Sequence, residues 1–114
     1  MDTSDFNLKE RKCSACTPET PPLKGQELQQ FYERLSNDWK LVGDHHLEKN
    51  YTFKNFRQAL DFTVKVGEVS EQEGHHPEIF LTWGKVKLTV YTHAIDALSE
   101  NDFIWAAKVD QLHL

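Results

Sequence analysis

The sequence has few cysteines, no excess of basic charge and no long apolar run, and each shortage excludes a class of protein. Its 114 residues include two cysteines, too few for the disulfide framework of a small secreted domain. The net charge is −5 with histidine neutral, so the chain lacks the basic surface that nucleic acids or anionic membranes require. No apolar stretch reaches the roughly 18–20 residues of a membrane span, and the polar N-terminus has no signal-peptide core. We therefore expect a cytoplasmic protein whose partners are small molecules or proteins, with no nucleic acid and no membrane.

Residues 1–23 differ in composition from the rest of the chain. They hold both cysteines and three of the four prolines, and they show no apolar periodicity. We expect an extended, partly ordered N-terminal arm, followed by one domain over residues 24–114. Cys13 and Cys16 have C-x-x-C spacing, but a zinc knuckle needs a second pair and a redox motif should open a helix. We interpret these two cysteines as incidental.

Apolar spacing and helix-ending residues predict the elements of the domain. Asn55 is a good cap for a helix start, and Gly74 is the natural residue after its end. Ser99 and Asp102 form a capping-box pattern before a further helix. The expected elements are a helix at 28–35, a hairpin at 39–54, a helix at 55–73 with Phe56, Ala59 and Val66 inward, a hairpin at 78–93 turning at Gly84, and a helix from Ser99 with Phe103 and Ala106 inward. The predicted fold is α+β, a two-layer sandwich with a four-stranded antiparallel sheet, helices on one face and the order α-β-β-α-β-β-α.

Three histidines are expected at one end of the second hairpin. His75 and His76 lie between a helix end and Pro77, and His93 stands at the end of the last strand. Because the turn at Gly84 folds the chain back on itself, both segments reach the same end of the sheet. Imidazole can donate or accept a proton near neutral pH, so the three rings indicate acid/base chemistry. A catalytic zinc site would also use three histidines, but adjacent residues such as His75 and His76 rarely bind one ion.

These positions match a known pattern. The string Glu71-x3-His75-His76-Pro77-x5-Trp83-x9-His93-x8-Asp102 resembles the signature of the pterin-4a-carbinolamine dehydratases, known in animals as the dimerization cofactor of a homeodomain transcription factor. The resemblance extends to the run from Tyr51 to Ala59. It implies the fold reached above, a homodimer or homotetramer, and no cofactor or metal.

The resemblance also implies an activity. It is the loss of water from 4a-hydroxytetrahydrobiopterin to give quinonoid dihydropterin, which recycles the cofactor of aromatic amino-acid hydroxylases. We expect His75 and His93 to carry the proton transfers, His76 to orient the pterin, and Glu71 to position His75. The matching family positions are His75, His76 and His93, which we expect to be catalytic and to bind the substrate. We expect Glu71 and Asp102 to support them, and Trp83, Tyr91 and Thr92 to contact the substrate.

Two other functions fit the same residues. A protein-binding scaffold, like the animal relatives in their second role, would not need the histidines. A metal-dependent hydrolase would use the three imidazoles as ligands, and stoichiometric zinc in the purified protein would favour it.

Overall fold

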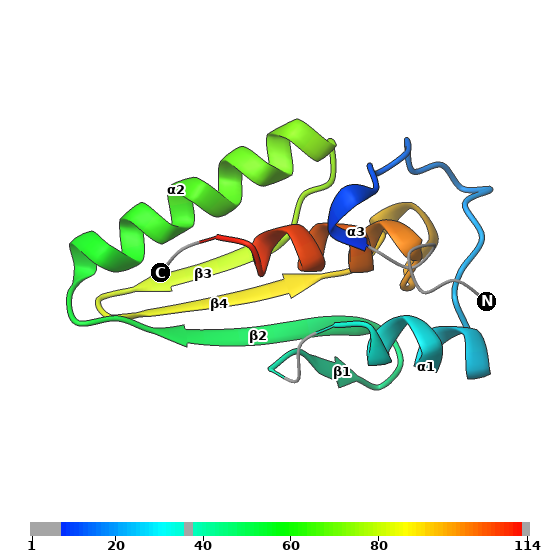
Figure 1. Cartoon of the computed structure of the whole chain (residues 1–114), viewed down its shortest axis with the longest axis horizontal. Coiled ribbons are helices and arrows are strands. Elements are labelled where there is room, and N and C mark those ends of the chain that lie inside the picture. Colours follow the sequence, from blue (N-terminus) through cyan, green and yellow to red (C-terminus); the bar gives the residue numbers. More distant parts are fainter. Residues whose placement is uncertain (1–7, 36–37, 113–114) are drawn as a thin grey trace.

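One four-stranded antiparallel sheet and three α-helices make up the domain (Figure 1). The computed structural model describes residues 8–35 and 38–112. The sheet order is β1-β2-β4-β3, and the predicted α+β fold with its α-β-β-α-β-β-α order is confirmed. The elements are η2 (Leu8–Glu10), α1 (Gly25–Glu33), β1 (Lys40–Val42), β2 (His46–Thr52), α2 (Phe56–Glu73), β3 (Glu78–Thr82), β4 (Lys85–Val90), η3 (His93–Ile95) and α3 (Glu100–Val109).

The second hairpin has the predicted turn and register. β3 pairs with β4 from Glu78 opposite Thr89 to Thr82 opposite Lys85. Side chains alternate along β4, so that its apolar residues are fully buried and its lysines face outward. The strand ends at Val90 rather than at His93. Thr92 instead forms an isolated bridge to Ala97, and His93 opens the short helix η3.

Helix α2 begins and ends at the predicted residues. The side chain of Asn55 accepts a hydrogen bond from the Gln58 amide, and Gly74 follows the helix in a left-handed conformation with φ of 63°. Its buried stripe is Ala59, Phe62, Val66 and Ser70. The expectation for Phe56 is wrong, because this first helical residue is 43% exposed. Phe62 fills the inner face instead and packs on the rings of Tyr51 and Phe53.

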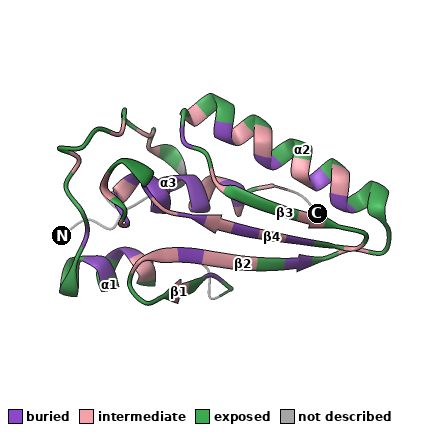
Figure 2. Ribbon diagram, turned by 180° about the vertical axis from the view of Figure 1, so that it is seen from behind, coloured by how far each residue is buried: buried purple, intermediate pink, exposed green. Residues whose placement is uncertain are grey.

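Helix α3 is buried on almost every side, which is more than the predicted single stripe (Figure 2). Phe103 contacts Phe31 of α1, and Trp105 packs edge-on against Trp39. The Trp105 indole also donates a hydrogen bond to Ser70 Oγ of α2. Helix α3 has no polar face because η2, α2 and α1 all pack against it.

The described part of the N-terminal arm packs on the domain. Leu8 of η2 is buried, and η2 lies along α3. The ion pair between Arg11 and Glu100 and the backbone bond from Leu23 N to Leu98 O join the arm to the start of α3. Residues 1–7, which also belong to the predicted arm, lie outside the described residues. Over residues 8–35 and 38–112, helices of the length and apolar character needed to cross a bilayer are absent.

Candidate functional site

Gly74 determines where the two adjacent histidines point. Its left-handed conformation ends α2, and the amides of Gly74 and His75 both bond to the Ser70 carbonyl. The chain then turns sharply before β3. As a result His75 enters the protein and is 5% exposed, whereas the side chain of His76 is 59% exposed. The two neighbouring imidazoles therefore occupy opposite environments.

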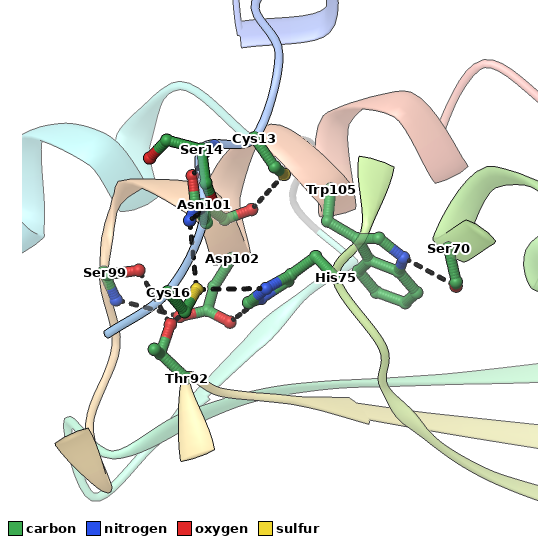
Figure 3. Close-up of polar contacts among 10 residues, drawn as sticks. All are labelled: Cys13, Ser14, Cys16, Ser70, His75, Thr92, Ser99, Asn101, Asp102 and Trp105. Atoms are coloured by element: carbon green, nitrogen blue, oxygen red, sulfur yellow. Dashed lines mark hydrogen bonds and ion pairs between the residues drawn. The ribbon is translucent and has the colours of Figure 1, made fainter. Parts of the chain in front are cut away.

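His75 forms a buried pair with Asp102 (Figure 3). Nε2 of His75 lies 2.6 Å from Oδ1 of Asp102, whose side chain is fully buried. The second carboxylate oxygen accepts hydrogen bonds from the Ser99 amide and from Thr92 Oγ1, both at 2.8 Å. A carboxylate can only accept, so this contact holds the proton of the His75 ring on Nε2. Nδ1 is then the nitrogen of His75 that is left to accept a proton.

Asp102 has two functions in one side chain. It completes the predicted capping box with Ser99 at the start of α3, and it also holds His75. The capping pattern explains why an aspartate stands there, and the helix start places its carboxylate beside the end of α2. The sequence predicts the cap and the family position, but not which histidine the carboxylate meets.

Glu71 contacts His76 and not His75. Its Oε2 lies 2.5 Å from Nε2 of His76 at the protein surface. The expected pairing with His75 is therefore wrong. Glu71 lies four residues before His75, but Gly74 ends the helix between them and turns His75 inward. The next residue, His76, comes back over Glu71.

His93 lies at the same end of the sheet, at the start of η3. Its ring packs on Tyr91 with centroids 4.2 Å apart, and Nε2 lies 3.8 Å from Oε2 of Glu78. Tyr91 in turn packs on His45, at 4.6 Å, and His45 is bonded to Asp96. The sequence predicts no role for His45, and its contact with Tyr91 is what connects it to the site.

Each candidate histidine thus has its own carboxylate. The pairs are His75 with Asp102, His76 with Glu71, and His93 with Glu78. The last two pairs are more than half exposed, while the first is buried. A carboxylate beside an imidazole orients the ring, and imidazole can donate or accept a proton, so this end of the sheet can both supply and remove protons.

The three further substrate contacts expected from the sequence lie in different places. Tyr91 flanks His93. Thr92 is 1% exposed and holds Asp102, so it supports the site from inside. Trp83 is 67% exposed in the turn between β3 and β4. At about 3.3 Å per strand residue, the length of β4 puts Trp83 roughly 20 Å from the end of the sheet that carries the histidines.

The arm brings both cysteines to the site. Sγ of Cys16 lies 3.6 Å from Nδ1 of His75, and Asn101 Nδ2 donates to the same sulfur. Cys13 N donates to Oε1 of Glu73, and the Cys13 thiol donates to the Asn101 carbonyl. Burial, reinforced by the charge of Glu73, raises the pKa of Cys13 to about 12. The C-x-x-C spacing is the one sequence signal for these contacts.

Residues 8–35 and 38–112 contain no cluster of three or more histidine, cysteine or acidic side chains arranged to bind a metal ion. Each of the three candidate imidazoles, His75, His76 and His93, faces a carboxylate or a thiol of its own rather than a shared point.

Comparison with known proteins identifies the family of the chain. A model of the family described as pterin 4 alpha carbinolamine dehydratase matches residues 21–112. Proteins named putative pterin-4-alpha-carbinolamine dehydratase from Alkaliphilus metalliredigens and Rubrobacter xylanophilus are 51% and 49% identical. Each alignment has 105 residues, covering 92% of this chain and 95% or 97% of the relative.

Two solved structures have the same fold. A transcriptional coactivator/pterin dehydratase from Brucella melitensis superposes with a TM-score of 0.71 at 26% identity, covering 79% of this chain and 96% of that one. A pterin dehydratase-like RuBisCO assembly factor of the alpha-carboxysome gives a TM-score of 0.56 at 28% identity, covering 66% and 88%. With nearly all of its length matched by named dehydratases, the chain belongs to the pterin 4 alpha carbinolamine dehydratase family, whose members are lyases.

Proposed function

We propose that this enzyme dehydrates 4a-hydroxytetrahydrobiopterin to quinonoid dihydropterin by histidine acid/base catalysis, and so recycles the pterin cofactor of aromatic amino-acid hydroxylases. The observation that supports it is the set of three imidazole–carboxylate pairs at one end of the sheet. The family match supports the substrate class.

The reaction needs one proton donor and one proton acceptor. The N5 lone pair of the carbinolamine expels the 4a-hydroxyl as the C4a–O bond breaks, and a donor protonates that oxygen to release water. An acceptor then removes the N5 proton, which leaves a carbon–nitrogen double bond. Imidazoles titrate near neutral pH, so they can perform both steps without a cofactor.

The burial of the rings supports a division of roles. His93 and His76 are exposed and can reach a substrate at the surface. With Asp102 on Nε2, His75 accepts at Nδ1, where the incoming proton replaces the hydrogen bond from the Cys16 thiol. We assign proton transfer to His93 and His75, and orientation of the pterin chiefly to His76, with Tyr91 beside His93 as a flat surface for the ring.

The test is the dehydration rate of enzymatically generated 4a-hydroxytetrahydropterin. The wild-type chain should accelerate the reaction, and His75→Ala and His93→Ala should each lower kcat by well over tenfold, the usual scale of acid/base catalysis. Lys54→Ala is the control and should retain the wild-type rate, because this exposed residue lies just before α2, at the end of the helix away from His75. Unchanged rates in both histidine variants would remove the proposed mechanism, and no acceleration by wild type would remove the proposed activity.

A second candidate function is protein binding. The edge strand β3 carries the exposed apolar side chains Ile79 and Phe80, with Trp83 just after it, and Figure 2 shows the strand mostly exposed. The names of the two structural neighbours refer to coactivation and to assembly.

We propose that a second copy of this chain covers this edge in a homodimer or homotetramer. Light scattering that compares the mass of Phe80→Lys with that of wild type tests this proposal. A variant mass equal to that of wild type would contradict the placement.

A further inference from the structure

The sulfur of Cys16 completes the surroundings of the His75 ring (Figure 3). Nε2 of His75 faces Asp102 at 2.6 Å, and Nδ1 faces Cys16 Sγ at 3.6 Å, within reach of a thiol hydrogen bond. His75 is 5% exposed. With Nε2 protonated toward the carboxylate, Nδ1 is an acceptor and the thiol is the donor that meets it. Both nitrogens of this buried imidazole are therefore engaged, one by the domain and one by the arm.

Several contacts hold the sulfur in this position. Asn101 Nδ2 donates to Cys16 Sγ at 3.1 Å, and the same amide group exchanges two hydrogen bonds with the Ser14 backbone at 2.8 and 3.0 Å. Asn101 is 4% exposed. Consecutive residues of α3 thus hold the two sides of the ring, because Asn101 fixes the arm and Asp102 fixes His75.

Cys13 provides a second anchor for the arm. Its amide donates to Glu73, and Glu73 accepts a hydrogen bond from Lys108 of α3 at 2.6 Å. Burial alone would raise the pKa of Glu73, but the bonds from Lys108 and from Cys13 more than offset it and keep the pKa below its ordinary value. Within three residues of Cys16, the arm is therefore bonded to the end of α2 through Glu73 and to the start of α3 through Asn101. The alignments with relatives include 105 of the 114 residues, so they also extend into the arm.

We infer that Cys16 is a positioning residue of the site: its thiol, on the N-terminal arm, fixes the orientation and the protonated nitrogen of the His75 ring. The expected effect of Cys16 on the dehydration rate rests on the proposed function. The expected effect on the orientation and protonated nitrogen of the His75 ring does not. Without the thiol, the ring keeps Asp102 on one side and meets a small void on the other. Nδ1 then loses its fixed partner, and the ring samples other orientations.

The first measurement does not depend on activity. Long-range ¹H–¹⁵N spectra of the full chain report which imidazole nitrogen carries the proton. Cys16→Ala should shift the Nδ1 resonance of His75 and leave those of the exposed His76 and His93 in place. Cys13→Ala is the matched control. It also removes a thiol from the arm, but the Cys13 thiol contacts the backbone carbonyl of Asn101 and not the His75 ring. It should leave all three rings unchanged.

The second measurement is steady-state dehydration under reducing conditions. Cys16→Ala should lower kcat by about tenfold with a nearly constant KM, the effect of losing one hydrogen bond at a reacting group. Cys16→Ser should recover part of the rate because its hydroxyl also donates, and Cys13→Ala should match wild type. Thermal melts confirm that each variant is folded.

The possible outcomes are separable. If His75 gives the same resonances in Cys16→Ala as in Cys13→Ala, the inference is overturned. If Cys16→Ala shifts the His75 resonances but keeps the wild-type kcat, the thiol does not affect the reaction, and that part of the inference is overturned. If wild type itself shows no dehydration, the proposed function fails, and the spectra alone then decide whether Cys16 positions His75.

Discussion

Oδ1 of Asp102 lies 2.6 Å from Nε2 of His75, although the two residues belong to different segments of the chain, 27 positions apart. The same carboxylate caps α3 through the Ser99 amide. The geometry of the helix start and the state of a candidate catalytic ring are therefore determined by one buried side chain. A change in the charge of Asp102 must affect both.

Asp102→Asn separates these two effects. Asparagine keeps the size of the side chain and can still accept from the Ser99 amide, so we expect a folded protein that loses about 1–3 kcal/mol of unfolding free energy. The amide can donate as well as accept, so it no longer fixes the proton of the His75 ring on Nε2, and kcat should fall by more than about tenfold. Asn55→Ala is the control, since it removes the cap of α2 at a distance from the histidines and should cost about 1 kcal/mol without altering kcat. A folded Asp102→Asn enzyme with the wild-type rate would contradict this role.

Glu71→Gln tests the exposed pair with His76. Both side chains are more than half exposed, so the ion pair should contribute less than about 0.5 kcal/mol to stability. The main effect expected of Glu71→Gln is on the reaction. We expect kcat to fall severalfold because His76 loses its orienting carboxylate. Glu68→Gln, an exposed acid one turn earlier on α2, is the matched control. Equal kcat values for the two variants would show that Glu71 has no part in the reaction.

Local signals in the sequence are sufficient to predict the helices and strands that carry the site. Gly74 and the Ser99–Asp102 box predict the helix ends, and the alternation around Val86 and Leu88 predicts the strand and its buried face. These signals act over a few residues, through backbone conformation and capping bonds. The pairing of the second hairpin follows from its turn, so the shared end of the sheet is predictable.

Contacts between distant segments are not predictable in the same way. The expected Glu71–His75 pairing fails because Gly74 ends the helix between the two residues and turns His75 inward. Cys16 reaches His75 from 59 positions away, and a C-x-x-C spacing in a proline-rich arm does not indicate which side chain it meets. Trp83 belongs to the family string, although the hairpin puts it at the end opposite the histidines. Packing of the arm on the domain decides the Cys16 contact, whereas the other two positions follow from the helix end at Gly74 and the turn at Gly84.

Two glycines should respond to alanine in opposite directions. A Cβ on Gly84 would lie 2.9 Å from the Phe53 carbonyl oxygen, a backbone atom that cannot move freely, so Gly84→Ala should cost about 1–3 kcal/mol. Gly67 lies inside α2, and a Cβ added there would meet nothing of the surrounding structure within 4 Å. Gly67→Ala should therefore add about 0.5–1 kcal/mol through helix propensity. Urea unfolding of both variants gives the comparison, and a shift in the same direction for both would contradict it.

Cys13 links the arm to stability at alkaline pH. Burial raises the pKa of its thiol from the ordinary 9.0 to about 12, with Glu73 adding to the effect. Between these values the unfolded chain releases the thiol proton while the folded chain keeps it, so the unfolding free energy decreases as pH rises. Burial also raises the pKa of Tyr51, which adds a similar decrease at still higher pH.

Urea unfolding at about pH 8 and about pH 10.5, on either side of the ordinary thiol pKa, tests this effect. We expect a smaller loss of stability in Cys13→Ala than in wild type between the two pH values. Ser14→Ala, an exposed neighbour without a titrating group, should lose as much as wild type. If Cys13→Ala and Ser14→Ala lose the same free energy between the two pH values, the thiol is not buried as the arm contacts require.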